Sequence, residues 1–343
     1  MNKKFICFFL IVSLFFLTIL VLYKNSTRHL INKLFDGKIK LFSNSEKNNS
    51  NLVLYRPNNN EIHIYSVMRE GNTLLTKFSK KEWGTWNIDG WFLTEGRIPA
   101  ENTVLLAGAD TDWEYVFRVS EKPDAVCEFS GGNHGKESLN DITFINPQND
   151  SEIVLPVNKT VEVECLRIVE KTSLFFDDNC TKKYADVQRK YFFLPSKIVL
   201  ETEFSFLSDV YMGTSYVCMF PVPKEYGRYA KFMDTGNIVT TPGPGTTATT
   251  NTFENFLGKE KTKSVQIWGD INPSYKFNVW IENEEMVDNF NNKLKVFYWD
   301  MNRVSNKLYF SKYDNEAYTK IHSGTKWYNK AGWEISISND EGT

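Results

Sequence analysis

The stretch Trp113–Val119, WEYVFRV in one-letter code, carries an apolar side chain at every second position. Val161–Cys165, VEVEC, repeats this alternation. Successive side chains of a β-strand point to opposite faces of a sheet, so a period of two predicts strands with one buried face. The two stretches therefore predict half-buried strands and set the fold class for the rest of the chain.

Strand-like runs continue along most of the chain on both sides of these two. They are Leu52–Tyr55, Glu61–Met68, Asn72–Phe78, Thr202–Leu207, Val210–Val222, Tyr275–Glu282, Leu294–Trp299, Lys307–Tyr313 and Trp327–Ser338. Turns rich in Gly, Asn and Asp separate them, and Glu284–Lys293 predicts a short helix. Short strands at this frequency favour an all-β, mainly antiparallel fold, either a β-sandwich or a jelly roll.

The chain begins with Lys3, Lys4 and an uncharged apolar run, Phe5–Tyr23. At about 1.5 Å per residue, about 20 such residues cross the hydrocarbon core of a bilayer. No alanine precedes Ala100, so the small-residue cleavage site of a secretory signal peptide is missing. The sequence therefore predicts an uncleaved signal-anchor in residues 1–23 that contacts the lipid bilayer through residues 5–23. A cleaved signal peptide is the alternative.

Residues 24–51 predict a juxtamembrane segment followed by a polar stalk, Ser43–Asn51. The remaining residues, 52–343, form the predicted β-rich domain. We expect the short N-terminal tail in the cytoplasm and this domain outside it. The prediction is therefore a single-pass membrane protein with an extracytoplasmic body.

The composition indicates which ligands the predicted β-rich domain can bind. The chain carries 40 Lys and Arg against 42 Asp and Glu, without the basic stripe of a nucleic-acid-binding domain. Aromatic residues make up 15% of it, enough for paired rings in a β-rich core and for exposed rings that stack on sugars. We therefore expect a polysaccharide ligand and no nucleic acid.

Four cysteines follow the apolar run and permit two disulfides, of which we expect one at most. They are Cys127, Cys165, Cys180 and Cys218. None of their spacings is Cys-x-x-Cys, which disfavours a zinc ribbon.

The strongest candidate for chemistry is Phe129–Glu137, FSGGNHGKE. An apolar strand runs into paired glycines, which permit unusual backbone angles and the close approach of a ligand. Polar side chains able to bind or transfer protons then follow closely. A glycine-rich surface turn that merely exposes a histidine is the alternative.

These residue types suit β-elimination in an acidic polysaccharide. The reaction requires a group that neutralises the uronate carboxylate, a base for the C5 proton and an acid for the leaving oxygen. Asn133 and Arg228 are the candidates for the carboxylate, and His134 and Tyr216 are those for the base and the acid. The substrate-binding candidates are Tyr211, Tyr226, Lys136 and Glu137. The set is similar to the residues that jelly-roll polysaccharide lyases place on a concave face, and we predict no cofactor and no metal.

Two alternatives stay open. The stretch Gly131–Glu137 resembles the zinc-binding turn of metallocarboxypeptidases and related deacylases, which implies a zinc-dependent hydrolase with His134 and Glu137 as ligands. That family also needs a downstream histidine, for which only His322 remains, after a very different set of elements. The other alternative is a non-catalytic surface module that binds carbohydrate or protein.

Two further segments allow both a structural and a functional interpretation. The loop Thr240–Thr250, TTPGPGTTATT, has no apolar anchor except Ala248. It predicts a mobile segment, either a plain surface loop or a lid over a cleft. Acidic pairs such as Asp110 and Asp112 predict solvated turns, with calcium binding or a place beside a glycosidic bond as the alternatives.

Overall fold

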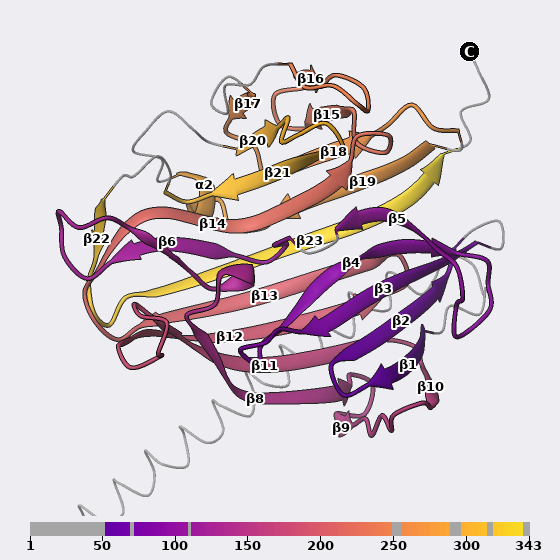
Figure 1. Ribbon diagram of the computed structural model, residues 1–343, viewed down its shortest axis with the longest axis horizontal. Helices are drawn as coiled ribbons and strands as arrows, with labels where there is room; N and C mark the ends of the chain where they lie inside the picture. The colour runs from indigo at the N-terminus through magenta and orange to yellow at the C-terminus, as the bar shows by residue number, and fades with distance from the viewer. Residues whose placement is uncertain are drawn as a thin grey trace, which may run out of the picture. The chain divides into compact units, whose positions relative to one another are not determined.

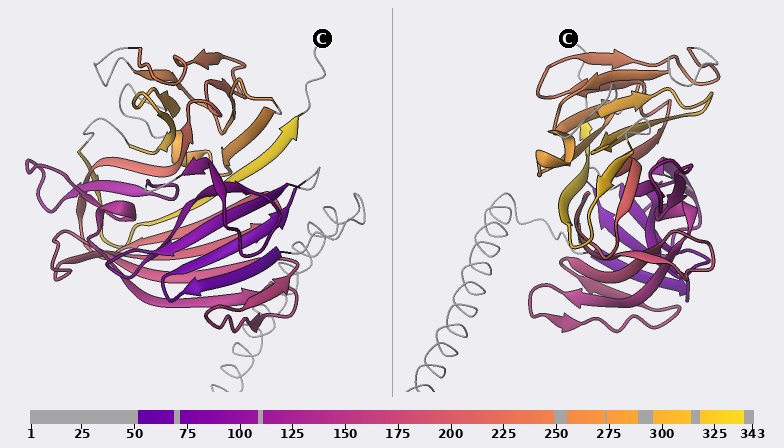
Figure 2. Two further views of the ribbon diagram at one scale, coloured as in Figure 1. Left: turned by 45° about the vertical axis from the view of Figure 1, so that its right-hand side comes forward. Right: turned by 90° about the vertical axis from the view of Figure 1, so that its left-hand side faces the viewer.

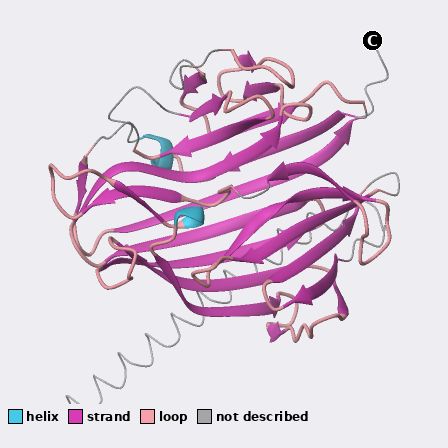
Figure 3. Ribbon diagram, in the orientation of Figure 1, coloured by secondary structure: helices cyan, strands magenta, loops and turns pink. Residues whose placement is uncertain are grey.

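Three antiparallel sheets carry the fold of the computed structural model (Figures 1 and 3). The structure describes residues 52–68, 72–108, 111–248, 255–272, 274–288, 296–313 and 318–338. The three sheets, the helical turns and their contacts lie within these residues.

The first sheet has six strands in the order β10-β1-β2-β3-β4-β5. They are β1 (Leu52–Asn58), β2 (Glu61–Val67), β3 (Thr73–Lys80), β4 (Trp86–Thr94), β5 (Thr103–Gly108) and β10 (Thr160–Val163). The next sheet has seven strands in the order β17-β20-β21-β14-β6-β7, with β22 paired to β14. They are β6 (Val116–Ser120), β7 (Glu128–Ser130), β14 (Val210–Pro223), β17 (Phe256–Glu260), β20 (Val296–Trp299), β21 (Ser305–Ser311) and β22 (Thr319–Ile321).

The largest sheet has ten strands in the order β16-β15-β18-β19-β23-β13-β12-β11-β8-β9. They are β8 (Glu137–Asn146), β9 (Ser151–Glu152), β11 (Leu166–Phe175), β12 (Lys183–Leu194), β13 (Lys197–Phe206), β15 (Tyr229–Phe232), β16 (Ile238–Thr240), β18 (Ser264–Trp268), β19 (Ser274–Ile281) and β23 (Lys326–Ser338). Two short helical turns accompany the sheets. They are η2 (Gly132–His134) and α2 (Glu285–Asp288).

The ten-stranded sheet is one layer of a sandwich, and the two smaller sheets together form the other layer. Phe78 of β3 packs on Tyr191 of β12, with ring centroids 5.0 Å apart. Phe117 of β6 packs on Phe204 of β13 at the same distance. In the left view of Figure 2 the violet strands β1–β4 lie in front of the pink strands of the ten-stranded sheet. Both smaller sheets therefore bury one face against the same partner.

A tryptophan pair joins the two smaller sheets along their shared boundary. The rings of Trp91 and Trp113 lie 5.2 Å apart, and Trp91 is also 6.0 Å from Phe220 of β14. Both tryptophans are fully buried. The main core is therefore one continuous layer of side chains.

The structure confirms the predicted antiparallel, all-β class. A jelly roll has eight strands in two sheets, whereas the described residues form three sheets, so that finer prediction is wrong. The predicted helix over 284–293 appears as the single turn α2, and its second half lies outside the described residues. The long strands β11 and β12 were not predicted, because Glu170 and Arg189 occupy buried positions where the alternation calls for apolar residues.

The predicted membrane segment is not described. Within the described residues, no helix is long and apolar enough to cross a membrane. Residues 5–23 and the stalk up to residue 51 lie outside those residues, so the anchor, its orientation and the extracytoplasmic location stay predictions. The four cysteines from Cys127 to Cys218 are free, and no disulfide joins them.

The loop that follows β16 is tied down over its described part, 240–248. Gly245 N donates to Arg303 O at 2.8 Å, and Ala248 N donates to the Asp300 carboxylate at 2.7 Å. The fully buried Lys224 ammonium pairs with Asp300 and also donates to Thr246 O. The prediction of a mobile segment is therefore wrong for this part of the loop, which leaves the lid alternative without support there.

Candidate functional site

The glycine turn between β7 and β8 wraps around one carboxylate. Gly131, Gly132 and Gly135 have φ angles of 86°, 57° and 68°, which favour glycine. A Cβ atom on Gly132 would overlap Asp112 Oδ1. Asn133 N donates to the same oxygen at 2.5 Å. The paired glycines thus let the backbone close over Asp112.

His134 stands at the outer side of this turn. Its Nε2 lies 3.7 Å from Asp112 Oδ2, and its side chain is 39% exposed while that of Asp112 is 7% exposed. The imidazole stacks on Phe129, with ring centroids 4.3 Å apart and an angle of 16° between the planes. The ring is therefore oriented by Phe129, backed by a carboxylate and open to solvent.

A buried lysine completes the cluster from the other end of the chain. Lys307 Nζ lies 3.9 Å from Asp112 Oδ2 and donates to Thr111 Oγ1 at 2.7 Å. Burial lowers the pKa of Lys307 to about 8, against the opposing effect of Asp112. Burial also lowers the pKa of His134, and Lys307 adds to that effect while Asp112 opposes it. At neutral pH the cluster therefore combines a mostly neutral imidazole with a mostly charged ammonium.

An aromatic platform adjoins this cluster on the outer face of the seven-stranded sheet. We define the platform as Tyr216 of β14, Phe256 of β17, Phe297 and Trp299 of β20, and Tyr309 of β21. Strand alternation sends Tyr298 and Leu308 into the main core, so their neighbours face the opposite way.

The platform rings touch one another across neighbouring strands. Tyr309 lies 4.6 Å from Tyr216 and 4.9 Å from Phe297, measured between ring centroids. The Lys307 ammonium lies 5.2 Å from the Tyr309 centroid, so it joins the platform to Asp112. Phe297 and Tyr309 are buried, whereas Tyr216, Phe256 and Trp299 remain partly exposed.

Asn133 and His134 thus lie at the Asp112 cluster, and Tyr216 belongs to the platform that Lys307 joins to it. Arg228 does not join them. It precedes β15 in the ten-stranded sheet and pairs with Asp270 at 2.7 Å.

Two predicted substrate-binding tyrosines also lie elsewhere. Tyr226 packs against Tyr275 at the main core and is 8% exposed. Tyr211 lies near the N-terminal end of β14, and the Lys320 ammonium lies 6.0 Å from its ring centroid.

Glu137 and Lys136 were predicted to bind substrate, and their positions argue against that role. Glu137 is fully buried, and its Oε1 accepts hydrogen bonds from Tyr115 and Thr172 at 2.6 Å each. Lys136 pairs with Glu128 beside the turn. Because Glu137 faces the core while His134 faces solvent, the predicted zinc pair does not form. Nor does any group of three His, Cys, Asp or Glu side chains in the described residues suit a metal ion.

Sequence reasoning missed Lys307 and the burial of Asp112. Asp112 belongs to an acidic pair that predicts a solvated turn, yet its side chain is buried. Lys307 begins one of the predicted strands, with no local sign that its ammonium points at a carboxylate. The turn itself was the usable signal, because paired glycines next to a histidine indicate a tightly packed backbone.

No protein-family model matches the chain, and no curated protein matches it by sequence. Among solved structures, it is similar to the galactosidase domain of the alpha-galactosidase–sucrose kinase AgaSK, with 11% identity, a TM-score of 0.42, and coverage of 83% of this chain and 41% of that chain. It is also similar to the heparan sulfate lyase HepC from Pedobacter heparinus, with 8% identity, a TM-score of 0.38, and coverage of 84% and 37%.

A third similar structure is the Slr1438 protein from Synechocystis sp. PCC 6803, with 9% identity, a TM-score of 0.32, and coverage of 83% of this chain and 98% of that chain. The chain spans about two fifths of the length of the first two structures. All three TM-scores are below 0.5, so the proposals below rest on the residues of this chain alone.

Proposed function

We propose that the protein acts on an acidic polysaccharide as a β-elimination lyase, at the face formed by the His134 cluster and the aromatic platform. The observation that carries this proposal is the arrangement of His134 and Lys307 around Asp112. An exposed, mostly neutral imidazole is ready to accept a proton. The nearby ammonium supplies the positive charge that a uronate carboxylate requires.

Each group then has a role in the elimination. The partly exposed platform rings, Tyr216, Phe256 and Trp299, stack on the sugar. Asn133 binds the uronate carboxylate, and the buried Lys307 ammonium behind it stabilises the negative charge that develops there. His134 removes the C5 proton, and the released electron pair forms the C4–C5 double bond as the C4–O bond breaks. Tyr216 protonates the leaving oxygen and is reprotonated from solvent. Lys307 thus takes the role that the sequence assigned to Arg228.

The test is the ultraviolet absorbance of newly formed unsaturated uronate. The purified full chain, in mild detergent, is incubated with hyaluronan, chondroitin sulfate, heparan sulfate, alginate and polygalacturonate. We expect a rising signal on at least one of them and its loss in His134→Ala. His322→Ala is the matched control, because His322 Nδ1 also lies 3.7 Å from an aspartate, Asp209, at the surface. No signal on any polymer, or equal rates in the His134 variant, would refute the lyase.

A non-catalytic carbohydrate-binding module is the second candidate, and the exposure of the platform favours it. Tyr216, Phe256 and Trp299 come from three strands and remain partly exposed, which suits stacking on a sugar without any proton transfer. In that case Trp299→Ala abolishes polysaccharide binding, whereas His134→Ala leaves it unchanged. A binding titration of both variants alongside the absorbance assay separates the two candidates.

A further inference from the structure

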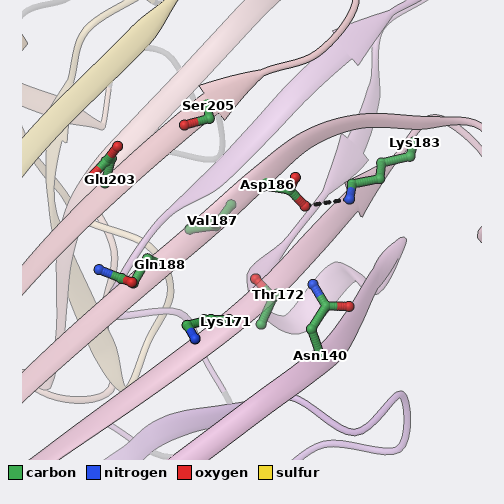
Figure 4. Close-up of a pocket in the computed structure, with 9 residues that line it drawn as sticks. All are labelled: Asn140, Lys171, Thr172, Lys183, Asp186, Val187, Gln188, Glu203 and Ser205. Carbon is green, nitrogen blue, oxygen red and sulfur yellow. Dashed lines mark ion pairs between the residues drawn. The ribbon is translucent and has the colours of Figure 1, made fainter. Parts of the chain in front are cut away.

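The ten-stranded sheet carries an open polar hollow on the face that points away from the sandwich core (Figure 4). Its volume is about 460 Å³, within the range of about 300–1,000 Å³ typical of small-molecule sites. Four neighbouring strands line it, chiefly through Asn140, Lys171, Asp186, Gln188, Glu203 and Ser205. The hollow is therefore a feature of the sheet itself rather than of a loop.

Strand alternation explains why these side chains point outward. In β12, Val187 and Arg189 are buried while Asp186 and Gln188 are only partly buried. In β13, Phe204 and Phe206 belong to the main core, so Glu203 and Ser205 lie on the other face. The hollow and the core thus occupy opposite faces of the same strands.

A β-bulge shapes one wall of the hollow. The pairing of β8 with β11 shifts between Lys171 and Thr172, which leaves Asn140 as the extra residue. Asn140 Nδ2 donates to Ser173 Oγ at 2.9 Å, and Ser173 Oγ donates to Asp186 Oδ1 at 2.9 Å. Lys183 Nζ lies 2.5 Å from the same Asp186 oxygen. This wall is therefore held in place before any ligand arrives, which lowers the ordering cost of binding.

The lining determines the chemistry of the ligand. Lys171 and Lys183 supply cations, Asp186 and Glu203 supply carboxylates, and Asn140 and Gln188 supply amides. An apolar ligand would strip water from these groups without replacing their hydrogen bonds. A polyanion would meet the two carboxylates. A ligand rich in hydroxyl groups satisfies every group, because each hydroxyl both donates and accepts.

An exposed ring borders the same region. Tyr328 of β23 is the direct strand partner of Glu203, so both side chains stand on the outer face of the sheet. The residue is 41% exposed. Beside it, Lys326 Nζ donates to Glu203 Oε1 at 3.0 Å and orients that carboxylate. A ring next to ordered hydrogen-bonding groups suits the face and the hydroxyl groups of a sugar.

We propose that this hollow is a second binding site, for a neutral oligosaccharide, on the opposite layer of the sandwich from the His134 cluster. The site holds the sugar by hydrogen bonds with Asn140 and Gln188, by sugar hydroxyls that donate to Asp186, and by stacking on Tyr328. It needs neither the charge of Lys307 nor the aromatic platform. The proposal is therefore independent of the lyase.

The experiment is a calorimetric titration of the full chain with neutral hexasaccharides of glucose, xylose, mannose and galactose. We expect at least one to bind, and we expect Gln188→Ala and Tyr328→Ala each to weaken it at least tenfold. Lys190→Ala is the matched control, because Lys190 lies two positions further along the same face of β12, outside the hollow. It should leave the affinity unchanged.

His134→Ala separates this site from the proposed lyase, since it should abolish the elimination and leave hexasaccharide binding intact. Thermal melts of each variant check that the fold is retained. The proposal is overturned if no hexasaccharide binds, or if binding survives Gln188→Ala and Tyr328→Ala. It is also overturned if His134→Ala or Trp299→Ala removes binding, because the ligand would then sit on the other layer.

Discussion

Raising the pH towards neutral should cost this protein stability at Glu170, because its core holds three carboxyl groups against one guanidinium. Glu114, Glu137, Glu170 and Arg189 are all 0% or 1% exposed. Arg189 Nη2 lies 2.8 Å from Glu170 Oε2 and 3.5 Å from Glu137 Oε1. Full ionisation would leave two buried negative charges without a cation, which a protein interior does not tolerate. The cluster therefore retains protons.

Burial governs the pKa values of Glu170 and Glu114. Burial raises the pKa of Glu170 from 4.5 to about 8, with Arg189 opposing and the other two carboxylates adding to the effect. Burial also raises the pKa of Glu114. The native state thus keeps a proton that the unfolded chain has already released. Because Glu170 binds its proton more tightly in the folded protein, its contribution to the free energy of unfolding falls as the pH rises through this window.

The size of the effect follows from proton linkage. One proton held only by the native state changes the free energy of unfolding by about 1.4 kcal/mol per pH unit. Between about pH 5.5 and about pH 7, Glu170 alone therefore costs about 2 kcal/mol of stability.

Urea unfolding at both pH values measures this loss in the wild type and in Glu170→Gln, whose amide does not titrate. The lowered pKa values of His63 and His134 act in the opposite direction, since the native state then binds fewer protons than the unfolded chain. Both histidines are present in the two proteins, so the difference between the proteins isolates Glu170. An identical pH dependence in the two proteins, or a wild type that gains stability relative to the variant, would refute the reasoning.

Three further predictions concern single substitutions. Gly132→Ala should lower the free energy of unfolding, measured in urea, by about 1–3 kcal/mol, because the new Cβ overlaps Asp112 at a residue in the left-handed conformation. Gly236→Ala is the control and should lower it less, because Gly236 has φ +76° but no atom within 4 Å of the new Cβ. Arg189→Met should lower the free energy of unfolding by about 3–5 kcal/mol, because it leaves buried carboxylates without a cation. An unchanged urea midpoint would contradict this. Asp112→Asn should lower the pKa of His134 further in an NMR titration, because Asp112 now raises it; a higher pKa would mean that the carboxylate does not act on the ring.

Local patterns predicted much of this fold. Alternation located the strand that holds Phe117 and the strand pair around β13 and β14, because side-chain orientation in a strand depends only on the neighbouring residues. It failed at Glu114, whose neighbours fit the pattern but whose carboxylate is buried and accepts a hydrogen bond from Ile88 N at 2.7 Å. A charged residue in a sequence predicts a solvent-facing side chain, because charged groups are rarely buried unless they are paired. Only the structure shows that Glu114 has such buried partners.

The candidate site was likewise predictable from the sequence only in part. Its turn was visible because three glycines and a histidine within five residues are a local signal. Its charge cluster was not visible, since Thr111 and Lys307 are 196 positions apart and meet only through the order of strands in the sheet. Arg228 and Tyr226 looked equally suitable in sequence, and the topology placed them elsewhere.

The sequence by itself determined the antiparallel β class and the glycine turn that carries His134, because both depend on interactions between near neighbours. Only the tertiary structure decided which side chains meet. It placed Lys307 and Asp112 beside His134, buried Glu137 with Arg189, and formed a polar hollow on the outer face of the opposite layer. The physical reason is that strand pairing is a long-range choice, settled by the burial of a shared core rather than by any segment alone.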